Sequence, residues 1–211
     1  MTSKTHKIGL LGLFLLVTVV LCVGCGKESS DITARILKAT GKVEIKQPVA
    51  VSFTEAKEND ILACGGILKT GDEASAMLEI IGKGVVELKS DALFELEPDK
   101  DYVVQKSGMA IYKIDKNKEG FKVKSPQGVT CVLGTKFMVR ALENITVTGV
   151  EEGKVSFTAN NGVIKNLAAR QKIIADNSGF VGEILDFDLS SDAFNYLQIE
   201  GKGVPKETVE K

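Results

Sequence analysis

Cysteine thiols are the most reactive side chains in this sequence of 211 residues, and two of the four lie at the end of an apolar run. The run, Ile8–Val23, carries no charge and follows a short segment with two lysines and no acid. A basic segment, an apolar stretch and small residues, in that order, are typical of a secretion signal. The run has about 16 residues, slightly fewer than the roughly 17 to 25 that a membrane-spanning helix needs. We therefore predict that residues 1–24 are a signal peptide.

The end of this run resembles the lipobox of bacterial lipoproteins, in which small or apolar residues and a glycine precede an acylated cysteine. The residues concerned are Leu21-Cys22-Val23-Gly24-Cys25, and Cys22 stands where leucine is usual. The resemblance implies that the thiol of Cys25 receives a diacylglyceryl group and that cleavage after Gly24 makes Cys25 the new N-terminus. An uncleaved N-terminal membrane helix is the alternative. Several acyl chains on one cysteine form a lasting anchor, since each buried methylene contributes about 0.8 kcal/mol.

This assignment predicts a lipid-anchored protein of the bacterial cell envelope, facing the periplasm or the cell surface. Residues 25–31 are then the lipidated cysteine and a polar tether, and the folded domain begins at Ile32. The membrane is the expected partner through the lipid. Another envelope protein or a cell-wall polymer is expected to bind the domain itself.

Cys64 and Cys131 would remain in the mature domain and could pair in an oxidising envelope compartment. A disulfide closing a loop of that size would stabilise the fold by roughly 4 kcal/mol. The alternative is that both thiols are small buried apolar groups. The sequence does not choose between these two interpretations.

Composition argues against several functions. The one histidine, His6, lies in the predicted signal, and the chain has no tryptophan. Removing the signal leaves 25 of the 27 basic residues against 28 acidic ones, a net charge of −3, which gives no basic excess for nucleic acid. Without a histidine the domain lacks the commonest general base and zinc ligand, so we expect no metal or cofactor and no enzyme activity.

Two groups of charged residues suggest alternatives. A hydrolase acting on an envelope polymer could take its acid and base from carboxylates, although a solvated face explains them equally; the candidates are Asp60, Asp72, Glu79, Glu87, Glu95 and Glu151. A basic stretch could meet anionic lipid headgroups, although Asp115 and Glu119 interrupt it and favour a charged hairpin; it consists of Lys113, Lys116, Lys118, Lys122 and Lys124.

From Ile32 onward, apolar residues recur at every second position in short runs divided by Gly, Asn, Asp and Pro. That pattern predicts an all-β domain over residues 32–185, built as a sandwich, a jelly roll or a β-solenoid. Phe121–Lys124, Ile145–Thr148 and Lys154–Phe157 alternate clearly, and Val49–Phe53 is expected to be a further strand. Residues 186–211 are expected to form a short helix, capped near Ser190 and presenting Phe194, Tyr196 and Leu197, and a polar tail.

Several segments in this β domain resemble the FecR domain family, over roughly Ile32 to Ala175. The marks, in chain order, are Asp60-Ile61-Leu62, Gly65 to Gly71 with Thr70, Ser75 to Ile80, Val86-Glu87-Leu88, Ser90 to Leu96, Ser125 to Gly128 with Pro126, Val132 to Val139 with Gly134, Thr135 and Phe137, and Val147 to Val155 with Gly149 and Gly153. Three positions depart from the family pattern: Asn59 and Ser125 replace a usual Gly and Thr, and Gly66 replaces a usual Asp.

The resemblance implies a fold without a recognised catalytic set, because most of the marks are turn residues. It implies that Gly134 forms a tight turn and that Thr135 hydrogen-bonds to nearby backbone. The regulators that give the family its name join this domain to a cytoplasmic segment through a membrane helix, and only seven residues precede the apolar run here. We therefore expect a stand-alone, non-catalytic binding or scaffold protein, with a part in a sensing or cell-wall assembly.

Overall fold

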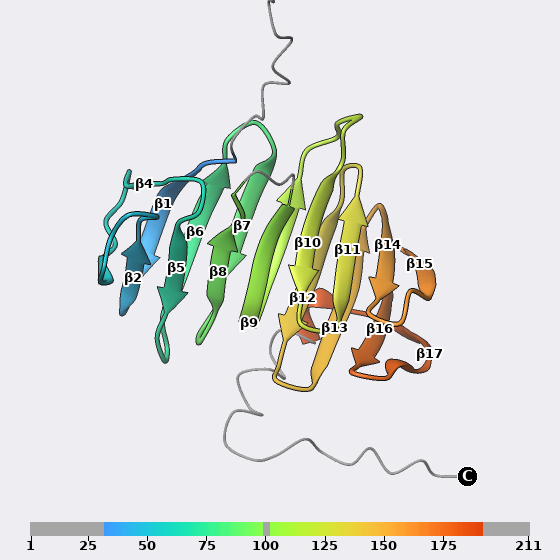
Figure 1. The fold of residues 1–211 in the computed structure, drawn as a ribbon. Helices are drawn as coiled ribbons and strands as arrows, with labels where there is room; N and C mark the ends of the chain where they lie inside the picture. Colours follow the sequence, from blue (N-terminus) through green and yellow to red (C-terminus); the bar gives the residue numbers. More distant parts are fainter. Residues whose placement is uncertain (1–31, 99–101, 192–211) are drawn as a thin grey trace, which may run out of the picture.

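The computed structural model describes residues 32–98 and 102–191, and β-strands make up most of them (Figure 1). The first strands are β1 (Ala34–Thr40), β2 (Val43–Lys46), β3 (Thr54–Glu55), β4 (Ile61–Leu62), β5 (Ile67–Thr70), β6 (Ser75–Ile80), β7 (Gly84–Leu88) and β8 (Leu93–Leu96). A long strand, β9 (Tyr102–Ile114), lies in the middle of the domain. After it come β10 (Phe121–Ser125), β11 (Gly128–Val132), β12 (Lys136–Ala141), β13 (Ile145–Glu152), β14 (Lys154–Ala159), β15 (Ile164–Ala168), β16 (Gln171–Asp176) and β17 (Gly179–Asp186).

These strands form two layers. Sheet A has the order β4-β1-β6-β7-β9-β12-β13-β16-β17, and sheet B has the order β3-β2-β5-β8-β9-β10-β11-β14-β15. Only the β9–β10 pair is parallel among these pairings. Strand β9 belongs to both layers, so the pairings run through it as one continuous open sheet. The predicted all-β class is confirmed.

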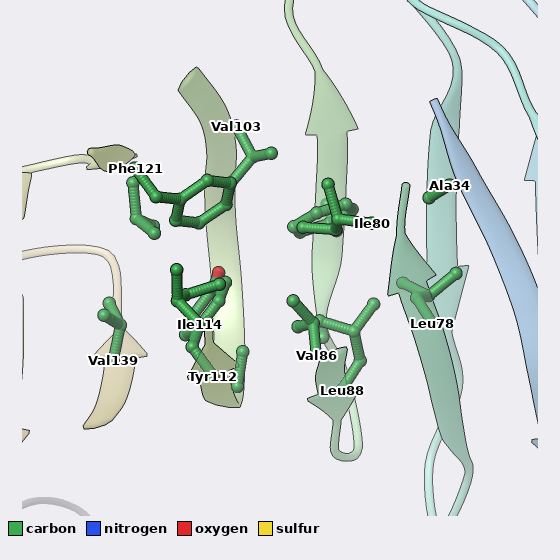
Figure 2. Packing of buried hydrophobic residues seen from close by; sticks show 14 of the residues in the cluster. Ala34, Leu78, Ile80, Val86, Leu88, Val103, Tyr112, Ile114, Phe121 and Val139 are labelled. Atoms are coloured by element: carbon green, nitrogen blue, oxygen red, sulfur yellow. The ribbon is translucent and has the colours of Figure 1, made fainter. Parts of the chain in front are cut away.

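Apolar side chains of the two layers meet between the sheets. Tyr112 of sheet A lies 6.2 Å from Phe121 of sheet B, measured between ring centroids, and stacks on Phe137 at 4.9 Å. Figure 2 labels members of this core from both layers: Val103 and Phe121 of sheet B, and Ile80, Val86 and Leu88 of sheet A. Alternation produces this core, because every second side chain of a strand points to the same face. It confirms the expected pattern of Phe121–Lys124, where Phe121 and Val123 are buried and Lys124 is exposed.

In two places the structure differs from the expected alternation, in which apolar side chains face the core and polar ones face water. In Ile145–Thr148 the threonines, not the apolar residues, face the core: Thr146 hydrogen-bonds to Gln127 at 2.7 Å, and Thr148 lies 3.3 Å from Thr130 Oγ1. Pairing of β13 with β12 and β16 fixes this register, and Phe187 covers the part of the outer face of sheet A to which Val147 belongs. Val49–Phe53 is a loop rather than a strand, since residues 47–50 turn on a hydrogen bond from Ala50 N to Gln47 O.

The cover on sheet A comes from the C-terminal segment. Phe187 packs with Met109 and Met138, and Val147 and Leu189 adjoin this second cluster. Gly149 leaves the space for the ring, because a Cβ there would lie 2.5 Å from Phe187 Cδ2. Residues 189–191 begin a helical turn, while Phe194, Tyr196 and Leu197 lie outside the described residues, as do the signal and tether. Within residues 32–98 and 102–191, no helix is long and apolar enough to cross a membrane.

Strand β9 crosses from sheet B to sheet A at Gly108. Its first half pairs with β8 and β10, and its second half pairs with β7 and β12. Gly108 has a φ of +78°, and Gln105 Nε2 donates to its carbonyl at 2.9 Å and to that of Val139 at 3.0 Å. The Tyr112 hydroxyl donates to Gln105 Oε1 at 2.8 Å, and burial raises the pKa of Tyr112 well above its usual value. A satisfied polar network therefore holds the corner between the layers.

The strand registers place the turns at two ends of the sandwich. The N-terminal end, at the top in Figure 1, carries Ile32 and the turns after β2, β6, β9, β11 and β13. The distal end carries the turns after β1, β5, β7, β10, β12 and β14. Every part of the candidate site lies at or beside the N-terminal end.

Candidate binding groove

The turn between β11 and β12 forms the centre of the candidate site. Gly134 has a φ of +142°, and a Cβ there would lie 2.7 Å from Lys116 Cα. Thr135 N donates to Ile114 O at 3.1 Å and Ile114 N returns a bond of 3.0 Å, so this turn is fastened to the end of β9. The Thr135 hydroxyl donates to Lys154 O at 2.9 Å. A Cβ on Gly153 would lie 2.9 Å from that hydroxyl oxygen, so the β13–β14 turn also packs closely against the β11–β12 turn.

A groove of about 890 Å³ opens beside the β9–β10, β11–β12 and β13–β14 turns. Residues 116–120 line one side of it, residues 131–135 and 153–156 line its middle, and Asn166 and Leu167 complete the other side. Leu133, which is 65% exposed, is one of the apolar residues that line it. The groove is large enough for a small molecule or a short peptide segment.

Lysines make the groove cationic. Lys116, Lys118, Lys122 and Lys154 line it, against the single acid Glu119. Glu119 is engaged by Lys83 from the neighbouring turn at 2.9 Å, and that hydrogen bond holds the pKa of its carboxyl below the usual value. The groove thus presents several positive charges around an apolar surface, which suits an anionic ligand with apolar parts.

The lysines of the predicted basic stretch do not all lie in the groove. Lys116, Lys118 and Lys122 line the groove, whereas Lys113 lies on sheet A opposite Lys136, and Lys124 lies 6.0 Å from the Tyr102 ring. Sequence reasoning missed Leu133, Ser156 and Asn166 as parts of one site. They come from three strands or turns that become neighbours only through the pairing of β11, β14 and β15.

The other family-motif residues serve the fold. Thr70 is buried; its hydroxyl donates to Lys89 O at 2.6 Å and accepts from Ala92 N at 2.8 Å, while Gly71 N donates to Lys42 O. Pro126 lies in the β10–β11 turn, also at the distal end, where its carbonyl accepts from Asn160. Phe137 is in the core, and a Cβ on Gly65 would lie 3.2 Å from Pro98 Cγ and 3.3 Å from Pro48 Cγ.

The suggested disulfide is not formed. Cys64 Sγ lies 3.7 Å from the carbonyl oxygen of Glu97, the residue that follows β8. Cys131 is in β11 and lines the groove. Strands β8 and β11 are three places apart in sheet B, which corresponds to about 14 Å. A disulfide needs Cα atoms within roughly 7 Å, so pairing would require the sheet to be rebuilt.

The six carboxylates of the hydrolase alternative lie on separate strands and turns. Glu79 pairs with Arg35, Glu87 with Lys89 and Glu95 with Lys106, and Asp60 accepts a hydrogen bond from Lys57 N. Asp72 lies in the turn after β5, and Glu151 lies in β13. Among the described residues, no three His, Cys, Asp or Glu side chains gather as a metal site. Local ion pairs or turns therefore account for all of these carboxylates except Glu151.

A substitution at Gly134 tests the tight approach at the centre of the groove. Valine there would bring a Cβ against the Lys116 backbone in a conformation that side chains rarely adopt, so we expect Gly134→Val to lower the free energy of unfolding by about 1 to 3 kcal/mol. Urea denaturation and limited proteolysis would measure this. Gly82→Val is the control, because it has a φ of +71° with no atom within 4 Å. If Gly134→Val lowers the free energy of unfolding no more than Gly82→Val does, the close packing at Gly134 is contradicted.

Comparison with known proteins supports the fold. Residues 67–156 match the family model described as FecR protein, so the resemblance in the sequence is confirmed over this segment. Two crystal structures of a "putative anti-sigma factor" from Parabacteroides distasonis are similar, each with a TM-score of 0.51 and 21% identity over 61% of this chain. The chain spans 63% and 64% of those chains, less than two thirds of their length. Among curated proteins, none matches this chain.

Proposed function

We propose that this chain, which carries the FecR match over residues 67–156, is a lipid-anchored, non-catalytic binding protein of the bacterial cell envelope with a sensing or regulatory role. The observation that carries the proposal is the cationic groove at the β9–β10, β11–β12 and β13–β14 turns, the last two of which contain Gly134, Thr135 and Gly153. These residues belong to the family pattern, and the groove gives that pattern a surface on which a partner can bind.

The chemistry of the groove indicates the kind of partner. Its four lysines favour a ligand with carboxylates or phosphates, and the exposed Leu133 favours an apolar side chain beside them. An acidic segment of another envelope protein has both features, and an anionic cell-wall polymer has the first. A protein held by a lipid in one leaflet needs a membrane-crossing partner to pass a signal inward, which favours the protein segment.

The proposal is tested by crosslinking in intact cells. A photoreactive amino acid at Leu133, which is well exposed within the groove, should yield a discrete adduct on irradiation. We expect the charge-reversing pair Lys116→Glu and Lys154→Glu to reduce that adduct at least about tenfold, since each lost contact with an anion is worth on the order of 1 kcal/mol.

The matched control places the same photoreactive group at Val163, which is also exposed but lies in the β14–β15 turn at the distal end. Adducts that are identical from both positions, or that persist unchanged in the charge-reversed variant, would refute the groove as the binding site. Hydrolysis of an envelope polymer by the purified chain, lost on removing one carboxylate, would instead support the enzyme alternative.

A further inference from the structure

The loop between β2 and β3 presents apolar side chains to solvent. This valine loop, residues 47–53, has no charged residue, and Val49 and Val51 are 96% and 98% exposed. Single exposed apolar residues are ordinary, but two valines this exposed on one protruding turn are not explained by packing. The loop lies outside residues 67–156, so the family match does not account for it.

The base of the valine loop is held in place. Gln47 Nε2 donates to Ile61 O at 2.7 Å, and Gln47 Oε1 accepts from Ala63 N at 3.2 Å. On the other side of the loop, Lys69 Nζ lies 4.7 Å above the Phe53 ring, and β3 pairs with β2. With both sides fastened, the valines cannot turn inward without breaking these contacts. Their exposure is therefore built into the fold.

The position of the loop indicates what covers it. Ile32 begins the described domain at the N-terminal end, and Arg35 of β1 pairs with Ile61, whose carbonyl holds the loop base. Cys25 and Ile32 are seven positions apart in the sequence, a span of at most about 25 Å. Each sheet is nine strands across, or roughly 38 Å. A lipid on Cys25 would thus hold this corner of the domain, more closely than any other, against the bilayer.

We propose that the valine loop docks onto the bilayer, with Val49 and Val51 inserted at the boundary between headgroups and acyl chains. This inference rests on the proposed lipid anchor. The flanking charges balance, because Lys46 and Lys57 lie beside Glu55 and Glu58. Insertion is therefore driven by apolar burial rather than by anionic headgroups, so neutral phosphatidylcholine is a sufficient partner. Tethering supplies the effective concentration that two small side chains would otherwise lack.

The absence of tryptophan from the sequence makes a direct test available. The full acylated chain carrying Val51→Trp is placed in phosphatidylcholine vesicles with and without bromine on the acyl chains. We expect bromine to quench roughly half or more of the emission, because a side chain at that boundary lies about 5 to 10 Å deep. Raising the salt to about 0.5 M should change this little, since only charge interactions are screened. Adding Val49→Glu should lower the quenching at least about twofold.

The control is Val163→Trp, exposed at the distal end, which should remain almost unquenched. Flotation of the same samples separates the two proposals. A chain that floats with the vesicles but shows no more quenching at Val51→Trp than at Val163→Trp would overturn the docking while leaving the anchor intact. A chain that does not float refutes the anchor, and the docking falls with it.

Discussion

Gly108→Val is expected to prevent stable folding, with a loss of more than about 4 kcal/mol, because the corner of β9 has no room for a side chain. A Cβ at this position would lie 2.6 Å from Ala92 N and closer still to Ala92 Cα. Neither partner can retreat: Ala92 N donates to the buried Thr70 hydroxyl, and the Gly108 carbonyl accepts from Gln105. The φ of +78° adds strain of its own. Circular dichroism and urea denaturation would measure the loss.

Gly82→Val again serves as the control, because Gly82 shares a positive φ but sits in open space. Its free energy of unfolding should fall only by the strain of a left-handed backbone conformation, about 1 kcal/mol. The difference between the two variants isolates the collision with Ala92. If Gly108→Val unfolds within about 1 kcal/mol of Gly82→Val, the two layers are not joined as tightly at this corner as described.

Cys25→Ser is expected to abolish incorporation of labelled palmitate in cells, because serine lacks the thiol that accepts the diacylglyceryl group. Cleavage of such precursors follows acylation, so the variant should accumulate at its uncleaved length. Membrane extraction with detergent, gel mobility and autoradiography measure these effects together. The lipid anchor proposed above depends on this result.

Cys22→Leu supplies a matched control, since it removes the neighbouring thiol and places the usual leucine in the lipobox, three positions before Cys25 in the predicted signal. This variant should incorporate as much labelled palmitate as the wild type and should have the same length after cleavage. Label that persists in Cys25→Ser would refute Cys25 as the lipid site. Loss of label in both variants would show that the substitutions disturb export of the chain rather than removing the acceptor thiol.

Alternation was a reliable guide wherever one face of a strand meets the core and the other meets water, as in Phe121–Lys124 and Lys154–Phe157. It failed in Ile145–Thr148, because β13 has an occupied face on each side. Phe187 comes from 40 residues away to cover the outer face, so Val147 finds apolar contacts there and the threonines pair inside. It failed in Val49–Phe53 as well, because an alternating segment without a neighbouring strand has no partner for its backbone.

The candidate groove could be foreseen only in part. Gly134, Thr135 and Gly153 were identified as turn residues, and Lys116, Lys118 and Lys122 as a basic stretch. Nothing in the spacing shows that these two sets face each other. Hydrogen bonds between Ile114 and Thr135 bring the end of β9 beside the β11–β12 turn, and that contact creates the site.

The sequence by itself determined the all-β class, the FecR resemblance and the tight turn at Gly134, because alternation and glycine placement are local properties of the chain. Tertiary structure alone decided that Cys64 lies beside the end of β8, three strands from Cys131, that the lysines meet an apolar groove, and that Val49 and Val51 point into solvent. Each of those outcomes depends on which strands become neighbours. That choice is made by long-range pairing and packing of whole sheets, which no short segment encodes.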